Sequence, residues 1–258
     1  MKMRRGISFI FILIIISVLR IVNAQELSED KFRKGAEFYS AGEYQKALDL
    51  WMELYNTGNR STNLDYNIGN ANFKLDNIPG ALLFYERAHL LKPADEDINY
   101  NLQIARTRVV DRFKDIPVLF FVRWYDFVSL VVSSNSWAKI SLISFILCLF
   151  ALSVYFYTSI FKYKVLGFWL AIALFILSLV SLAFTLRNKS LVYDSRSAII
   201  FNPVVNGKSS PDASGTDLFI LHEGTKVKVE GDKVGEWFEI RLSDGNKGWV
   251  PANSLQII

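Results

Sequence analysis

The sequence has very few residues that bind metals or form cross-links. It contains one cysteine and two histidines in 258 residues. Cys148 lies within a long apolar run and has no second cysteine to join, so an intramolecular disulfide is excluded and every folded part must rely on its own core. His89 and His222 are far apart and have no neighbouring cluster of ligand residues. The sequence therefore gives no support for a metal site.

Motifs of catalysis are also missing. The chain has no Gly-x-Ser-x-Gly elbow, no phosphate-binding loop and no His-Glu-x-x-His pair. Its one carboxylate cluster, Asp95-Glu96-Asp97, follows Pro93 where a helix is expected to begin, so we interpret it as a helix cap. We expect a binding protein that is not an enzyme and that uses no cofactor.

The positive charge is not on the parts expected to fold in water. The formal net charge is +4, but residues 25–115 carry 12 basic and 15 acidic residues, and residues 190–258 carry seven basic and nine acidic residues. The excess of lysine and arginine flanks apolar segments instead. A nucleic-acid-binding protein needs a basic face on a folded module, so that class is excluded.

Long apolar segments dominate a chain that is 51% hydrophobic. Three basic residues precede the apolar stretch Ile7–Leu19, and the small residues Val22 and Ala24 follow it, which predicts a secretory signal peptide over residues 1–24. An uncleaved N-terminal anchor is the alternative. Either segment would deliver the following residues across a membrane.

Two uncharged runs, Ile140–Tyr157 and Val165–Leu186, are long enough for transmembrane helices, which we predict over 137–157 and 165–186. The turn 158–164 carries Lys162 and Lys164, which favours a cytoplasmic location for it. Residues 25–135 and 190–258 are then expected on the outer side. Gly167 and Ala171 predict close packing of the two helices.

Residues 116–135 form a segment of mixed character. Phe120, Trp124, Phe127 and Val131 recur at helical spacing, while charged residues occupy another face. The pattern predicts either a helix in the membrane interface or a final helix packed on the preceding domain.

Residues 25–115 contain a helical pattern that repeats every 34 residues. Three pairs of matching positions carry the repeat: Gly35 with Gly69, Ala47 with Ala81, and Trp51 with Tyr85. This pattern resembles the tetratricopeptide repeat, which implies paired antiparallel helices: two repeats, about 29–60 and 63–93, and a capping helix over about 95–113. Small residues would let helices approach, and aromatic residues would fill the space between stacked pairs.

The positions that face inward in this repeat family define a candidate peptide-binding groove. They map onto six residues of this chain: Arg33, Asn67, Asn70, Lys74, Asn101 and Arg108. Asparagine amides can hold the backbone of an extended peptide, and the cations can meet its carboxylates. Alternatively, the asparagines bond within the array and the charges are only solvated.

Residues 192–258 alternate as β-strands do. Three motifs resemble the bacterial SH3-like domain: Gly235-Glu236-Trp237-Phe238-Glu239-Ile240, the turn Asp244-Gly245, and Gly248-Trp249-Val250. We expect Val227, Val229, Ile240 and Trp249 in the core of a small barrel. Trp237 has the opposite strand parity, so it is a candidate ligand contact, unless the loop Gly207–Gly215 covers it.

The order of the modules is similar to that of BatE-type proteins, the E components of the aerotolerance (Bat) operons of the Bacteroidetes. The resemblance implies a multi-pass protein of the cytoplasmic membrane with both soluble domains on the periplasmic side. It also implies other Bat components, von Willebrand A domain proteins and a MoxR-type ATPase as partners, and a link to oxidative or envelope stress. A scaffold or sensor is therefore expected, and a peptidoglycan-binding module is the alternative.

Overall fold

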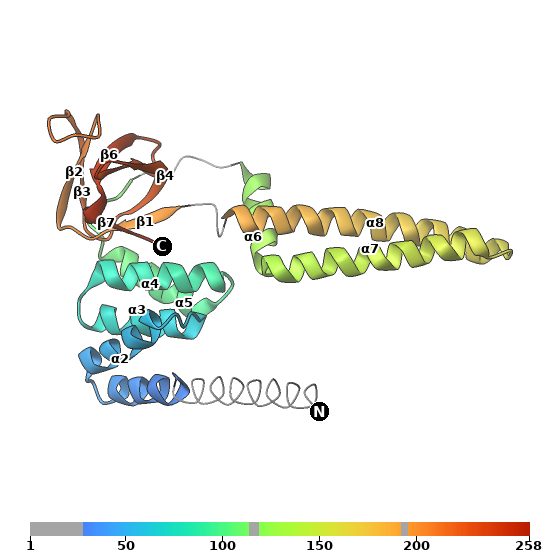
Figure 1. Ribbon diagram of the computed structural model, residues 1–258, viewed down its shortest axis with the longest axis horizontal. Coiled ribbons are helices and arrows are strands. Elements are labelled where there is room, and N and C mark those ends of the chain that lie inside the picture. Colours follow the sequence, from blue (N-terminus) through green and yellow to red (C-terminus); the bar gives the residue numbers. More distant parts are fainter. Residues whose placement is uncertain (1–27, 114–118, 192–195) are drawn as a thin grey trace, which may run out of the picture.

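The computed structural model describes residues 28–113, 119–191 and 196–258, so the predicted signal peptide lies outside the described residues. The described chain forms an N-terminal helical array, a long helical hairpin and a C-terminal β-barrel. Figure 1 shows the barrel beside the end of the array formed by α4 and α5, with the hairpin extending away from both.

The array is a series of antiparallel helices. Residues 28–40 are helical. Four helices follow: α2 (Tyr44–Asn56), α3 (Thr62–Lys74), α4 (Ile78–Leu91) and α5 (Glu96–Thr107). Ser61 and Asn77 cap the amino ends of α3 and α4 with their side-chain oxygens. Asp95 caps α5 by accepting from the backbone N–H groups of Asp97 and Ile98, so the predicted capping role of the acidic cluster is confirmed.

Glycines opposite large aromatic residues explain the helix pairing. A β-carbon on Gly69 would lie 2.6 Å from the ring of Tyr85, and one on Gly35 would overlap the indole of Trp51. Trp51 and Tyr85 are each only 1% exposed. The small residues therefore let the helices approach, as predicted, but each aromatic side chain packs against the glycine of its own helix pair, whereas it was expected between stacked pairs.

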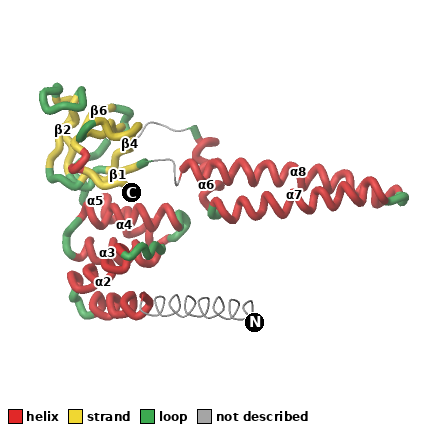
Figure 2. Tube along the Cα trace, in the orientation of Figure 1, coloured by secondary structure: helices red, strands yellow, loops and turns green. Residues whose placement is uncertain are grey.

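The barrel is one seven-stranded antiparallel sheet in the order β3-β2-β6-β5-β4-β1-β7. Its strands are β1 (Ser197–Ile200), β2 (Val204–Lys208), β3 (Asp217–His222), β4 (Lys226–Val234), β5 (Trp237–Arg241), β6 (Lys247–Pro251) and β7 (Leu255–Ile257). Figure 2 shows these strands grouped at one end of the chain trace. Gly207 belongs to β2, so the connection to β3 is shorter than the predicted loop Gly207–Gly215.

The barrel core contains Val227, Val229 and Ile240, as predicted, but Trp249 is outside it. In β6 the buried positions are Gly248 and Val250, so strand alternation turns Trp249 to the other face. The prediction that Trp249 is a core residue was therefore wrong. Phe219 takes up the space above Gly248, where an added β-carbon would lie 2.7 Å from its ring.

Two helices form the hairpin, α7 (Ser134–Tyr157) and α8 (Phe161–Lys189), and both are long and apolar enough to span a membrane, with mean hydropathy 2.3 and 2.6. Only residues 158–160 connect them. Lys162 and Lys164 therefore lie in the first turn of α8, and the predicted turn over 158–164 was too long.

Small residues line the contact between α7 and α8. A β-carbon on Gly167 would lie 2.9 Å from the carbonyl oxygen of Ala151, so a larger side chain would separate the helices. Ser141 and Ser178 each donate to the other's carbonyl oxygen, at 2.9 and 3.0 Å. The close packing predicted from Gly167 and Ala171 agrees with this geometry, because Ala171 packs against Cys148 in the same contact.

Helix α6 (Phe120–Val131) packs against the carboxyl end of α8. Asp126 accepts two hydrogen bonds from Arg187, at 2.6 and 3.0 Å. Its principal helix contact is thus with the hairpin, although Leu130 also lies near His89 and Leu90 of α4. Phe120, Trp124 and Phe127 are 84%, 63% and 67% exposed, which leaves an apolar stripe beside the hairpin.

Candidate functional site: the barrel surface and its contact with the helices

The asparagines predicted to bind a peptide form hydrogen bonds inside the array. The side-chain amide of Asn101 donates to the hydroxyl of Tyr66 at 2.6 Å and to Oδ1 of Asn70 at 3.2 Å. Tyr85 donates its hydroxyl to the same oxygen of Asn70 at 2.7 Å. Among the residues that the structure describes, the half-buried Asn67 makes no side-chain hydrogen bond. Of the three asparagines, Asn67 is thus the one whose side chain has no hydrogen bond within the described part of the array.

The cations predicted for the same groove have nearby partners. Arg33 contacts Asp30 at 2.7 Å, which raises the pKa of the guanidinium through that hydrogen bond. Arg108 contacts Asp76 at 2.9 Å. Lys74 points towards the ring of Tyr44, with 6.0 Å between the ammonium and the ring centre. The peptide-binding role of the six residues stays a prediction.

A buried carboxylate joins the array to the barrel. Glu86, on α4, is only 2% exposed and contacts Arg106 at 2.7 Å and Lys226 of β4 at 2.8 Å. Burial would raise its pKa, but Lys226 and Arg106 outweigh that effect and lower the pKa, so the carboxylate stays ionised. The pair of cations therefore stabilises a charge that water does not reach.

A second carboxylate holds the turn between β3 and β4. Asp111 accepts from the backbone N–H of His222 at 2.7 Å and from the hydroxyl of Thr225 at 2.6 Å, and its other oxygen lies 2.7 Å from Nδ1 of His222. Burial alone would raise the pKa of Asp111, but hydrogen bonds from Thr225 and His222 lower it. Arg87 adds a third link by donating to the carbonyl oxygen of Ile257 at 2.6 Å.

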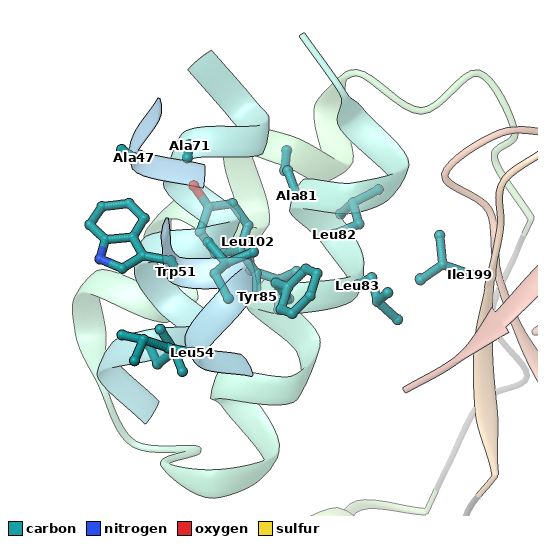
Figure 3. Packing of buried hydrophobic residues seen from close by; sticks show 14 residues of the cluster. Ala47, Trp51, Leu54, Ala71, Ala81, Leu82, Leu83, Tyr85, Leu102 and Ile199 are labelled. Carbon is teal, nitrogen blue, oxygen red and sulfur yellow. The ribbon is translucent and has the colours of Figure 1, made fainter. Parts of the chain in front are cut away.

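Apolar packing accompanies these polar links. Ile199 of β1 is 1% exposed and belongs to the core of the array; Figure 3 shows it beside Leu83 and Leu82 of α4. Gly224 has φ +83°, and a β-carbon there would lie 3.1 Å from Leu82 and from Val109. The array and the barrel therefore pack directly against each other at Ile199 and Gly224.

The outer face of strands β5 and β6, which points away from the barrel core, carries two tryptophans. Trp237 pairs with Pro251 and Glu239 pairs with Trp249, so Trp237 and Trp249 are diagonal neighbours on one face. Both are half-buried, and neither belongs to the barrel core. The strand parity predicted for Trp237 agrees with this register.

Comparison with known proteins agrees with this strand pattern. Residues 204–256 match the family of bacterial SH3 domains. The barrel contains a bacterial SH3 domain. No curated protein matches the chain. The matched residues run from β2 to β7, so strand β1, which carries Ile199 to the array, precedes the match.

Sequence patterns did not predict which residues join the SH3 domain to the array. Glu86, Asp111, Lys226 and Thr225 belong to no motif. One signal was present, because Glu86 follows the apolar run Ala81–Tyr85, and an acid in such a run needs a partner once it is buried. Its partner Lys226 is 140 positions away, so no local pattern identifies it.

Asp65 is a further buried acid that the sequence did not reveal. It is 2% exposed, and its Oδ1 has no hydrogen-bond partner among the described residues. Burial raises the pKa of Asp65 to about 6, although Arg87 and Arg60 favour the ionised form. Across the described ranges 28–113, 119–191 and 196–258, no three His, Cys, Asp or Glu side chains gather as metal ligands would.

Proposed function

We propose that this protein is a membrane-anchored scaffold or sensor that binds other proteins through a tetratricopeptide array and an SH3 domain acting as one unit. The observation that carries the proposal is the shared interface of the two modules, with Glu86 between Arg106 and Lys226. Modules held in a fixed relation present a single recognition surface, so a partner that contacts both loses less freedom on binding.

The geometry of the α7–α8 hairpin supports a membrane anchor that holds the array and the SH3 domain on the same side of the membrane. Ser134, at the start of α7, donates to the carbonyl oxygen of Thr185 near the end of α8 at 3.3 Å, so the helix ends that lead to the array and to the barrel are adjacent. If the hairpin spans a bilayer, both modules emerge from the same face. The exposed aromatics of α6 lie at this end, where interfacial aromatic residues are common.

The proposed sidedness rests on the N-terminal signal segment and on Lys162 and Lys164 at the opposite end of the hairpin. Single cysteines at Ser61, Ile160 and Ser209, in a Cys148→Ser background, test it with an impermeant maleimide. We expect labelling of positions 61 and 209 in intact spheroplasts and labelling of position 160 only after lysis. The reverse pattern would place the modules in the cytoplasm.

For the binding surface we propose the face that carries Trp237 and Trp249. Half-buried tryptophans next to Pro251 offer apolar area with few side-chain torsions to restrict, which favours contact with an extended peptide. The resemblance to BatE-type proteins suggests Bat components, including von Willebrand A domain proteins, as partners in oxidative or envelope stress. Peptidoglycan is the second candidate ligand, because the bacterial SH3 match is compatible with cell-wall binding.

Capture from cross-linked membranes tests this surface. The full-length protein and its Trp237→Ala variant are compared by mass spectrometry of the captured proteins, and purified murein is tested in parallel by sedimentation. Trp124→Ala, which removes an exposed tryptophan of α6, is the matched control. We expect Trp237→Ala alone to lose the partners while its thermal unfolding is unchanged. Equal capture by both variants would remove this face from the proposal.

A further inference from the structure

A cavity lies between the array and the SH3 domain. It has a volume of about 600 Å³ and takes its walls from α4, the residues after α5, strands β1 and β4, and the end of β5. This volume lies within the usual range of pockets that bury small molecules, and it far exceeds the space of a single ion. Because both modules supply its walls, the cavity exists only while they are docked.

The charge of the cavity is strongly positive. Five cationic side chains line it and only two carboxylates. The carboxylates, Glu86 and Asp111, are already engaged in the interface between the modules. Among the residues that the structure describes, Arg112 and Lys228 form no ion pair, although both line the cavity. Two cations, one from each module, therefore remain for a ligand.

Strand register supplies a second, independent observation. Lys228 of β4 lies directly opposite Arg241 of β5, and both residues line the cavity. Like charges in directly opposed positions destabilise a sheet unless an anion lies near them. Glu230 meets Arg241 from one side, but no carboxylate in the described ranges pairs with Lys228. An anion in the cavity would stabilise this arrangement.

The other residues of the cavity wall include apolar side chains, which indicates a ligand that has an apolar group as well as an anion. Leu82 and Val109 contribute from the array, and Leu242 contributes from the barrel. A ligand that fills the cavity needs a carboxylate for Lys228 and Arg112 and an apolar side chain beside it. A peptide with an acidic residue next to an apolar residue joins these two groups in one molecule.

We propose that this cavity binds a short peptide through a carboxylate next to an apolar side chain. The carboxylate would contact Lys228 and Arg112, and the apolar group would pack against Leu82 and Val109. Such a ligand bridges the two modules and stabilises their docked arrangement. The chemistry fits an acidic segment of a protein and also a stem peptide of the cell wall. Trp237 shares the outer face of β5 with Arg241 but does not line the cavity, so loss of binding at either place can be measured without the other.

Calorimetry with the full-length protein in micelles tests the proposal. One probe is acetyl-Ala-Leu-Glu with free carboxylates, the second is its neutral counterpart acetyl-Ala-Leu-Gln amide, and the third is a murein tripeptide. We expect the acidic peptide or the murein tripeptide to bind and the neutral peptide to bind at least about tenfold more weakly, because charged hydrogen bonds are lost. The peptide that binds more tightly identifies the source.

Variants locate the binding. Lys228→Gln is expected to weaken the bound probe at least about tenfold. Lys233→Gln removes a lysine of the same strand that does not line the cavity, and it is expected to leave binding unchanged. Trp237→Ala should also bind the probe normally. Absence of binding by every probe, equal binding of the neutral peptide, or normal binding by Lys228→Gln would overturn the proposal.

Discussion

The α7–α8 contact and the contact between the array and the SH3 domain are stabilised by different kinds of interaction. The contact between α7 and α8 uses small residues, such as Gly167, and reciprocal hydroxyl bonds between Ser141 and Ser178. The contact between the array and the SH3 domain uses two carboxylates, the buried Glu86 and the half-buried Asp111, with several partners each. The α7–α8 contact depends on close approach of the two backbones, whereas the contact between the array and the SH3 domain depends on ion pairs and hydrogen bonds to its carboxylates.

The difference follows from the surroundings proposed for each interface. Lipid provides little hydrophobic force between helices, so helices in a bilayer associate by close van der Waals contact and interhelical hydrogen bonds. A surface that docks in water can keep charged residues, provided that each buried charge finds a partner. Substitutions that remove a partner in the second interface, or add volume in the first, therefore distinguish the two mechanisms.

The largest effect is expected from removing both partners of Glu86. Arg106→Ala combined with Lys226→Ala leaves a buried carboxylate unpaired, which should lower the free energy of unfolding by about 3–5 kcal/mol. Chemical unfolding of the full-length protein in micelles, followed by tryptophan fluorescence, measures the loss. Adding Glu86→Leu should recover most of it, because an apolar side chain of similar size needs no partner.

Arg108→Ala is the matched control for that experiment, because Arg108 pairs with the exposed Asp76. It should change stability by less than about 1 kcal/mol. If the double variant is as stable as this control, the ion pairs of Glu86 do not stabilise the docked modules.

An intermediate effect is expected in the hairpin. Gly167→Val places new atoms against the backbone of Ala151 and should destabilise the contact by about 1–3 kcal/mol. Cysteines at positions 141 and 178, in a Cys148→Ser background, report the separation through their rate of disulfide formation. Leu166→Val changes an exposed neighbour and should leave that rate unaltered. An unchanged rate in Gly167→Val would mean that close approach is not required.

The smallest effect concerns Asp65, a buried acid without the partners that Glu86 has. Its folded pKa of about 6 is above its ordinary value of 3.8, so its contribution to stability is complete below pH 4 and is lost as the pH rises through 6. Asp65→Asn should therefore gain about 1 kcal/mol at pH 8 and nothing at pH 4. Melting curves at both pH values check this. A gain of equal size at both would rule out ionisation as the cause.

Local patterns predicted much of the architecture. The two apolar helices, the strands around Trp237 and the equivalence of Gly35 with Gly69 and of Trp51 with Tyr85 followed from spacing along the chain, whereas the contact of each glycine with its aromatic partner did not. The end of strand β2 was assigned to the predicted loop Gly207–Gly215, because Gly207 favours turns. The position of Trp249 was wrong because its face depends on the register with β5.

The predicted peptide-binding groove of the array likewise depends on contacts that local sequence patterns do not predict. Its residues lie on the predicted helices, but the contacts of their side chains depend on neighbours in other repeats. Asn101 reaches Tyr66 and Asn70 across 35 and 31 positions, and these bonds occupy its amide group. A repeat pattern places a residue on a helix face, whereas the competing hydrogen-bond partners are known only after the helices have packed.

By itself, the sequence determined the modules: a 34-residue helical period, two uncharged runs and the motifs of an SH3 domain, each of which acts through neighbouring residues. Only the tertiary structure decided how the modules meet. The bonds that join them connect Glu86 with Lys226 across 140 positions and Asp111 with Thr225 across 114. Hydrophobic periodicity does not predict such pairs, because the partner of a buried charge is any opposite charge that the tertiary fold places next to it. Here the barrel places Lys226 next to Glu86 when Ile199 packs against the core of the array.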